Sequence, residues 1–296
     1  MMGRTIAARP RPVSTENLAG SCSPGDFPLA SAGGLVRACV VTDMKIYCVQ
    51  HDIAWEKRRA NFARVEALLA AARPEAGSLV LLPEMFASGF SLNVPAIREG
   101  RERDTEKFLA ATAKKHNIHL LGGLVTTKTN GKGSNQCVVF SPEGREVARY
   151  TKLQPFTPGG ESGAYDPGRA PVLFTWEGFK VAPFICYDLR FPEHFRDATA
   201  RGAQLITVIA NWPVARIGHW VALLQARAIE NQAYVAGVNR CGTDPKLSYN
   251  GRSLIISPKG DILADAGNGE SVISADVRLD ELIAYRRDLR FLDDMR

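Results

Sequence analysis

Several common signatures are missing from this sequence, and each absence removes a class of protein. No apolar run approaches the roughly 18 residues that a membrane-spanning helix needs. The six cysteines are scattered without a CxxC pair, so the sequence indicates neither a zinc site nor a disulfide framework. We therefore expect no metal, no cofactor and no membrane partner, and we expect a reducing, cytoplasmic location that keeps thiols free.

Charge gives no evidence for a nucleic-acid partner. The net charge is +6, but lysines and arginines are interspersed with acids, as in residues 56–59 and 101–104. Such mixed charge is typical of solvated surfaces, whereas nucleic-acid sites gather cations in one patch. A nucleotide-binding α/β protein would also carry a glycine-rich phosphate loop after its first strand, and none follows residues 44–50.

Composition divides the chain at residue 44. Residues 1–43 are rich in Ala, Arg, Pro, Ser and Gly and show no sustained hydrophobic periodicity before residue 34. The segment lacks the apolar centre of a secretory signal and is only weakly similar to a transit peptide. We expect residues 1–43 to be a disordered extension and residues 44–296 to form the folded domain.

From residue 44 onward, strand and helix patterns alternate, which predicts one α/β domain with mixed sheets. Turns at residues 141–144 and 258–261 predict two hairpins. The expected strands are 44–50, 78–82, 118–125, 136–140, 146–150, 181–185, 204–210, 233–238, 253–257, 262–264 and 271–275, and the expected helices are 54–73, 105–117, 192–202 and 218–231.

Cys186 lies where an apolar strand stops and a helical stretch starts. Residues 181–185 form the apolar run, and Pro192 suits the first turn of a helix because its missing N–H costs nothing there. The N–H groups that begin a helix favour a thiolate and an oxyanion, so this corner suits a nucleophile. The alternative is an inert core thiol, since cysteine is among the most buried residue types.

Three further ionisable residues stand at or beyond strand ends. Glu84 comes directly after an apolar strand and a proline, Lys152 ends the first hairpin, and Glu161 lies in the long loop that follows. Loops at the strand ends of an α/β sheet commonly carry functional sites. Each residue alone has an ordinary explanation as a solvated or ion-paired side chain. Together with Cys186, Glu84 and Lys152 form a possible Cys–Glu–Lys catalytic set.

Three segments resemble the signatures of the nitrilase, or carbon–nitrogen hydrolase, superfamily. They are residues 81–86 (LLPEMF), 150–156 (YTKLQPF) and 184–192 (FICYDLRFP), in the order and rough spacing of that family. The resemblance extends from residue 44 to the C-terminus, and residues 85–90 (MFASGF) are most similar to the ω-amidase branch. It implies a four-layer α-β-β-α sandwich and a homodimer that forms through one helical face.

The same resemblance implies chemical roles. Cys186 is the nucleophile, Glu84 is the general base and then the acid, and Lys152 stabilises the tetrahedral oxyanion with the backbone N–H of Tyr187. Glu161 matches a second glutamate that orients the base or the lysine. We expect the helix start and Lys152 to lower the pKa of the Cys186 thiol. Glu84 then passes the thiol proton to the departing amine, and water hydrolyses the thioester that remains.

The ω-amidase branch implies a small-molecule substrate, namely a short dicarboxylic acid monoamide such as 2-oxoglutaramate or 2-oxosuccinamate. Its free carboxylate needs a cation. Arg216, which follows a strand end, is the candidate because arginine pairs with a carboxylate through two hydrogen bonds. Phe90, Trp212 and Tyr187 are candidates for the walls of the pocket.

Other functions remain open. An aliphatic amidase, a carbamoyl-amide hydrolase or a nitrilase would use the same three residues, and a catalytically silent dimerising protein would need none of them. A cysteine protease would need a histidine placed by a motif near Cys186, and the sequence has none. Arg227 and Glu230 lie three residues apart on an expected helix, which favours a structural ion pair over a site.

Overall fold

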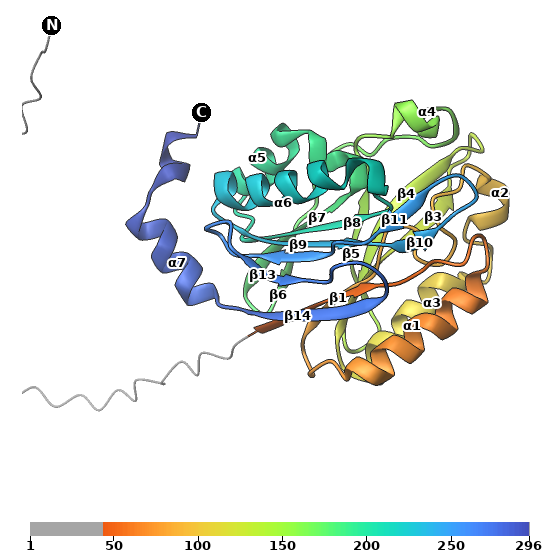
Figure 1. Ribbon diagram of the computed structural model, residues 1–296, viewed down its shortest axis with the longest axis horizontal. Coiled ribbons are helices and arrows are strands. Elements are labelled where there is room, and N and C mark those ends of the chain that lie inside the picture. Colours follow the sequence, from red (N-terminus) through yellow and green to blue (C-terminus); the bar gives the residue numbers. More distant parts are fainter. Residues whose placement is uncertain (1–43, 296) are drawn as a thin grey trace, which may run out of the picture. The chain divides into compact units, whose positions relative to one another are not determined.

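Two six-stranded mixed sheets pack face to face, and helices cover the outer face of each sheet (Figure 1). The structure is a computed structural model that describes residues 44–295. This arrangement confirms the expected four-layer α-β-β-α sandwich in a single domain. The expected N-terminal extension, residues 1–43, lies outside the described residues.

The first sheet has a parallel centre with antiparallel flanks. Its strands in spatial order are β14 (Ser271–Val277), β1 (Met44–Gln50), β2 (Leu79–Leu81), β3 (His119–Thr127), β4 (Gly133–Phe140) and β5 (Glu146–Thr151). Strands β1, β2 and β3 pair in parallel, whereas β14, β4 and β5 run antiparallel to the strands beside them. The hairpin of β4 and β5 confirms the first expected turn.

The second sheet has the same plan. Its strands in spatial order are β13 (Ile262–Asp265), β12 (Leu254–Ile256), β9 (Tyr234–Asn239), β8 (Leu205–Ala210), β7 (Phe179–Ile185) and β6 (Phe174–Trp176). Strands β7, β8 and β9 are parallel, and the hairpin of β12 and β13 confirms the second expected turn. A separate two-stranded hairpin pairs β10 (Cys241–Thr243) with β11 (Ser248–Asn250).

Four helices form the outer layers (Figure 1). Helices α1 (Arg58–Ala72) and α3 (Asp104–His116) cover the first sheet, and α5 (Pro192–Ala200) and α6 (Ile217–Asn231) cover the second. Helix α7 (Leu279–Asp288) follows β14. The shorter helical segments are α2 (Val94–Ile97), η1 (Thr157–Gly159), α4 (Glu161–Ala164), η2 (Cys186–Arg190), η3 (Val214–Arg216) and η4 (Phe291–Asp294).

Side chains that alternate along a strand contribute to two apolar layers, the core between the sheets and the layer under the helices. In β1, Ile46 and Cys48 belong to the core between the two sheets, whereas Tyr47 and Val49 pack with α1 and α3. Successive side chains of a strand point to opposite faces, so one strand serves both layers. The double-sided burial holds the strand ends rigidly, and those ends carry the site.

Two sequence expectations about helices are wrong. The helix expected over residues 54–73 begins at Arg58, because the Asn61 side chain binds both the N–H and the C=O of Ala54 at 2.8 Å and holds that residue in the preceding loop. The pattern also predicts no helix after residue 275, yet α7 forms there. Helix α7 has one buried residue, Leu282, so the helix leaves only a weak apolar periodicity in the sequence.

Candidate active site

Four strands of the two sheets deliver polar residues to one place. Lys152 follows β5 directly, Cys186 follows β7, Asn211 follows β8, and Glu84 lies just beyond β2. Glu84 and Lys152 are in direct contact, and the charges of both act on the Cys186 thiol. The structure therefore brings together the three residues that the sequence predicts as a catalytic set.

Cys186 occupies a strained turn. Its backbone φ is 47°, in the left-handed region that residues other than glycine avoid. The buried carboxylate of Asp188 holds the turn, because it accepts the N–H of Ile185 at 2.9 Å and the hydroxyl of Tyr150 at 2.7 Å. Backbone strain that the surroundings maintain in this way is typical of functional positions.

The helix that starts at this corner differs from the expected one. Cys186 begins the five-residue 3₁₀ helix η2, and the α-helix α5 begins only at Pro192. Pro192 therefore lies at the start of an α-helix as expected, whereas Cys186 lies at the start of a short 3₁₀ helix. A short 3₁₀ helix aligns few peptide dipoles, so it stabilises a thiolate less than the start of a long α-helix would.

Glu84 and Lys152 form the centre of a buried ion network. The Lys152 Nζ atom lies 3.0 Å from Glu84 Oε1 and 2.8 Å from Glu161 Oε2. The Lys152 residue is 2% exposed, and both glutamates are fully buried. Asn135 Nδ2 donates to both glutamates, at 2.7 Å and 2.9 Å, and the Asn211 N–H donates to Glu84 Oε2 at 2.9 Å. These contacts fix the direction in which each carboxylate points.

The network favours the charged forms of its members. Burial alone would raise the pKa of the Glu84 carboxyl, but the charge of Lys152 and hydrogen bonds from Asn135, Lys152 and Asn211 outweigh it and hold that pKa below its usual range. Burial would likewise lower the pKa of Lys152. Glu161 and Glu84 reverse that effect, so the pKa of the ammonium lies well above its usual range. Glu84 is thus a carboxylate and Lys152 a cation at rest.

The expected lowering of the Cys186 pKa is wrong. Burial is the largest cause that raises the pKa of this thiol well above its usual range, and the negative charge of Glu84 adds to it. Lys152 opposes the shift without overcoming it. The resting nucleophile is therefore a neutral thiol, with Sγ lying 3.9 Å from the backbone oxygen of Asn211, and it needs a base to activate it.

Two asparagines of the site are absent from the sequence prediction. Asn135 lies inside β4, where the sequence reading began the strand one residue later, at 136. A polar amide in a buried strand needs partners, and that is the signal that could have identified it. Asn211 follows β8, so the strand-end rule used for Glu84 and Cys186 also applies to it. Its Nδ2 donates to the backbone oxygen of Glu84 at 2.7 Å.

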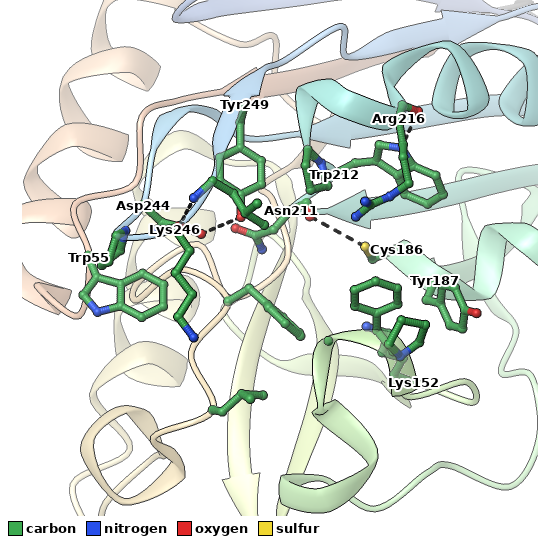
Figure 2. A pocket seen from close by; sticks show the side chains of 18 of the residues that line it. Trp55, Lys152, Cys186, Tyr187, Asn211, Trp212, Arg216, Asp244, Lys246 and Tyr249 are labelled. Carbon is green, nitrogen blue, oxygen red and sulfur yellow. Dashed lines mark hydrogen bonds between the residues drawn. The ribbon is translucent and has the colours of Figure 1, made fainter.

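A cavity of about 410 Å³ opens beside Cys186. Figure 2 shows the thiol, Tyr187 and Arg216 on one side of this pocket, with Trp55 and Lys246 on the other. All four residues that the sequence analysis assigned to substrate contact, Phe90, Tyr187, Trp212 and Arg216, line the cavity. The expected oxyanion donor, the Tyr187 N–H, belongs to the first turn of η2, whose N–H groups have no acceptor within the helix.

Two arginines enter the cavity without an acid partner among the described residues. The Arg216 guanidinium lies 5.6 Å from the ring centre of Phe156, and that of Arg190 lies 4.8 Å from the ring of Trp212. The Arg216 backbone oxygen accepts the indole N–H of Trp212 at 2.8 Å, which fixes the loop. Arg190 was not among the predicted residues, although it lies in the same segment as Cys186. Both cations are available to a bound anion.

The rest of the described chain limits other interpretations. Residues 44–295 contain no helix that is both long and apolar enough to cross a membrane. Within the same range, no group of three or more His, Cys, Asp or Glu side chains is placed to hold a metal ion. Arg227 Nη1 lies 2.8 Å from Glu230 Oε1, which confirms the expected structural ion pair.

Comparison with known sequences agrees with this geometry. The carbon–nitrogen hydrolase family model matches residues 45–287. The 2-oxoglutaramate amidase of Bacillus subtilis (strain 168) is 35% identical over 252 residues, which cover 85% of this chain and 97% of that protein. Omega-amidase YafV of Escherichia coli (strain K12) is 36% identical over 245 residues, covering 82% of this chain and 93% of that protein.

Solved structures give the same result. A carbon–nitrogen hydrolase superfamily protein of Xanthomonas campestris, XC1258, with an arsenic adduct in its active site, superposes with a TM-score of 0.79 at 31% identity, covering 86% of this chain and 98% of that chain. A mutant of the amidase from Nesterenkonia sp. AN1, in which acrylamide has added to the active-site cysteine, gives a TM-score of 0.74 at 28% identity, covering 83% and 98% of the two chains. The chain belongs to the carbon–nitrogen hydrolase family and is an amidase of the nitrilase superfamily.

Proposed function

We propose that the enzyme hydrolyses the terminal carboxamide of short dicarboxylic acid monoamides, such as 2-oxoglutaramate or 2-oxosuccinamate, to the acid and ammonia. The observation that carries the proposal is a single cavity that contains Cys186 and two arginines without carboxylate partners. One end of such a substrate is an amide for the thiol, and the other is an anion for a guanidinium. Relatives named as 2-oxoglutaramate amidase and omega-amidase support this substrate class.

The first step forms a tetrahedral intermediate. The Glu84 carboxylate takes the proton of the Cys186 thiol while Sγ attacks the amide carbon, so a carbon–sulfur bond forms and the carbonyl π pair moves to oxygen. The oxyanion lies near the ammonium of Lys152 and the N–H of Tyr187. The two carboxylates that bind Lys152 support this role, because they hold the ammonium in position before the substrate arrives.

The second step releases ammonia. Glu84, now protonated, delivers its proton to the amide nitrogen as the carbon–nitrogen bond breaks, so the leaving group is neutral ammonia. The acyl group remains on Cys186 as a thioester. The hydrogen bonds from Asn135 and Asn211 hold the Glu84 carboxylate in one orientation through both proton transfers.

The last step returns the free enzyme. Glu84 takes a proton from a water molecule that attacks the thioester carbon, and the carbon–sulfur bond then breaks. The departing thiolate recovers the proton from Glu84, and the carboxylic acid product leaves. Glu161 is a positioning residue in this scheme, because its carboxylate binds Lys152 at 2.8 Å and the Phe156 N–H at 2.6 Å.

Ammonia release and intact mass together test the proposal. The wild type should release ammonia from 2-oxoglutaramate much faster than from a plain aliphatic amide, a carbamoyl amide or a nitrile. Arg216→Ala should raise the KM for 2-oxoglutaramate about tenfold or more, the effect of losing a hydrogen bond to a charged group. A trapped acyl adduct should add mass to the wild type but not to Cys186→Ala. Equal turnover of aliphatic amide and 2-oxoglutaramate would contradict the substrate assignment.

We also propose a cytoplasmic location and a homodimer. The support for the location is that all four cysteines of the described residues are free thiols, as expected in a reducing compartment. The support for the dimer is the family expectation together with exposed apolar residues near α7. Residues 44–296 are further proposed to be sufficient for activity, because the family model matches within this range.

A further inference from the structure

The cavity extends well beyond the space that a short monoamide needs. Its volume of about 410 Å³ lies within the range of roughly 300–1,000 Å³ that holds drug-sized ligands. Arg216 and Cys186 lie on one side of the pocket, so a small substrate bound there leaves the opposite side unfilled (Figure 2). That opposite side contains an apolar side chain and a lysine.

Three apolar side chains line the cavity without belonging to the core: Trp55 on this opposite side (Figure 2), together with Leu92 and Leu247. Trp55 is half-buried, and Leu92 and Leu247 are 40% and 44% exposed. None of the three belongs to a buried apolar cluster in residues 44–295. The ring of Trp55 is seated on Gly89, where a Cβ atom would lie 3.1 Å from a ring carbon. Apolar groups that solvent touches and no core requires are typical of binding surfaces.

A lysine completes the opposite side. Lys246 lies on the same side of the pocket as Trp55 in Figure 2, and no carboxylate among residues 44–295 forms an ion pair with it. The one acid of the cavity lining, Asp244, is already engaged. Its carboxylate accepts the hydroxyl of Tyr249 at 2.5 Å and the backbone N–H groups of Lys246 and Leu247 at 2.7 Å. The ammonium of Lys246 is therefore free to bind an anion from the substrate.

We propose that Trp55, Leu92, Leu247 and Lys246 form a distal subsite for longer dicarboxylic acid monoamides. The amide binds at Cys186, the methylene chain lies on the apolar side chains, and the far carboxylate pairs with Lys246. A short monoamide instead places its carboxylate at the arginine side. The inference rests on the proposed function, since it uses the same hydrolysis of an amide at Cys186 and extends it to long acyl chains.

A comparison of glutaramate, suberamate and octanamide tests this subsite. The wild type should hydrolyse suberamate with a kcat/KM at least equal to that for glutaramate, because each methylene group that leaves water improves binding by up to about fourfold. Lys246→Ala should lower the suberamate-to-glutaramate ratio of kcat/KM about three- to fivefold, as expected for a partly exposed ion pair. Arg216→Ala should raise that ratio, since it weakens binding of the short substrate.

Matched variants separate the charge from the apolar surface. Lys246→Arg should keep the wild-type ratio, and Lys114→Ala, which removes an exposed lysine from α3, should leave it unchanged. Leu247→Ser should lower kcat/KM for suberamate and for octanamide alike, because both substrates place methylene groups on the same surface. Lys246→Ala should lower kcat/KM for suberamate and leave that for octanamide unchanged, because octanamide carries no carboxylate.

The outcomes distinguish this inference from the proposed function. If glutaramate is hydrolysed and suberamate is not, the distal subsite is wrong and the proposed function stands. If Lys246→Ala lowers kcat/KM equally for suberamate and octanamide, Lys246 does not bind the carboxylate, and the inference fails. If neither dicarboxylic monoamide is hydrolysed while octanamide is, the proposed function itself fails.

Discussion

Glu84 and Cys186 share one proton during the proposed reaction, and the buried site decides which of them holds it at rest. Burial and the charge of Glu84 raise the pKa of the Cys186 thiol, so the proton rests on sulfur. Many cysteine enzymes instead keep a thiolate beside a histidine cation. In the proposed reaction, activation coincides with substrate attack, and a neutral thiol reacts less readily with oxidants and alkylating agents between turnovers.

Glu84→Gln should separate the two effects of this carboxylate. Turnover should fall by about 10²- to 10⁴-fold, because the variant lacks the general base. The pKa of the Cys186 thiol should nevertheless move down, because the negative charge that opposes the thiolate is gone. The pKa is measured by following the ultraviolet absorbance of the thiolate as the pH rises. The same titration of Cys186→Ser gives the signal of the other cysteines, which is subtracted. A higher thiol pKa in Glu84→Gln would contradict the assigned electrostatics.

Asp188 should make the stability of the protein depend on pH. Burial raises the pKa of its carboxyl to about 6, and Lys152 and hydrogen bonds from Tyr150, Ile185 and Gln154 offset burial only in part. The folded protein therefore binds this proton more tightly than the unfolded chain does. The stabilising contribution is fully present below about pH 4 and is lost as the pH rises through about 6.

Asp188→Asn removes that titration. The stability of the wild type relative to this variant should fall by up to about 3 kcal/mol between about pH 4 and pH 7, two pKa units at about 1.4 kcal/mol each. Urea unfolding of both proteins at the two pH values measures the change. Asp294→Asn, at an exposed position, is the control and should show no such change. If the free energy of unfolding of the wild type instead rose with pH relative to that of Asp188→Asn, the site would stabilise the ionised carboxylate.

At the scale of elements, β3 approaches the turn that carries Glu84, the proposed base, closely enough to constrain the position of that turn. A Cβ atom at Gly123 of β3 would lie 2.4 Å from the Met85 nitrogen and 2.7 Å from the Glu84 Cα. Both neighbours are backbone atoms, which cannot rotate out of the way. A side chain at Gly123 must therefore displace the turn.

Gly123→Ala should lower kcat about tenfold to a hundredfold, since a shift of about 1 Å in a catalytic group has effects of this size. The free energy of unfolding should fall by about 1–3 kcal/mol from the steric overlap. Gly218→Ala is the control, because its Cβ atom would meet no atom within 4 Å. Unchanged kcat together with lower stability would show that Gly123 does not set the position of Glu84.

The sequence could predict the parts of the site that depend on strand ends alone. Glu84 and Cys186 stand just beyond the ends of apolar strands, and Lys152 follows an alternating hairpin strand; both kinds of strand are readable from the sequence pattern. Asn135 was missed because its role depends on partners 51 and 26 residues away, Glu84 and Glu161, which only the folded sheet brings near. The pKa of Cys186 was predicted in the wrong direction for a related reason, since depth of burial follows from tertiary packing.

Among the helices and strands, too, some could be predicted from the sequence and others could not. Strands buried on both sides, such as β8, were predicted closely because nearly every residue in them is apolar. Helix α7 was missed because its position depends on polar contacts rather than on an apolar face. Its Arg286 guanidinium donates to the backbone oxygens of Ala203, Asn231 and Gln232. Such contacts leave no periodic signal in the sequence.

For the whole molecule, a shortened chain that begins at Met44 should retain full activity. Both sheets, the cavity and the match to the family model lie within residues 44–295. We expect its kcat and its thermal unfolding midpoint to equal those of the full chain within error. Ammonia release and calorimetry on both proteins measure this. A large loss of activity would assign residues 1–43 a part in catalysis or folding.

Exposed apolar residues beside α6 and α7 favour the proposed homodimer. Ile229, Leu289 and Phe291 are 49%, 44% and 54% exposed, and Gln232, just after α6, donates to the Leu289 backbone oxygen at 2.8 Å. Phe291→Glu should weaken association at least tenfold, because a charge at an apolar contact loses its water on binding. Val147→Glu alters a residue of similar exposure, 42%, on β5 of the other sheet and should leave association unchanged. Analytical ultracentrifugation measures both, and a monomeric wild type at micromolar concentration would refute the dimer.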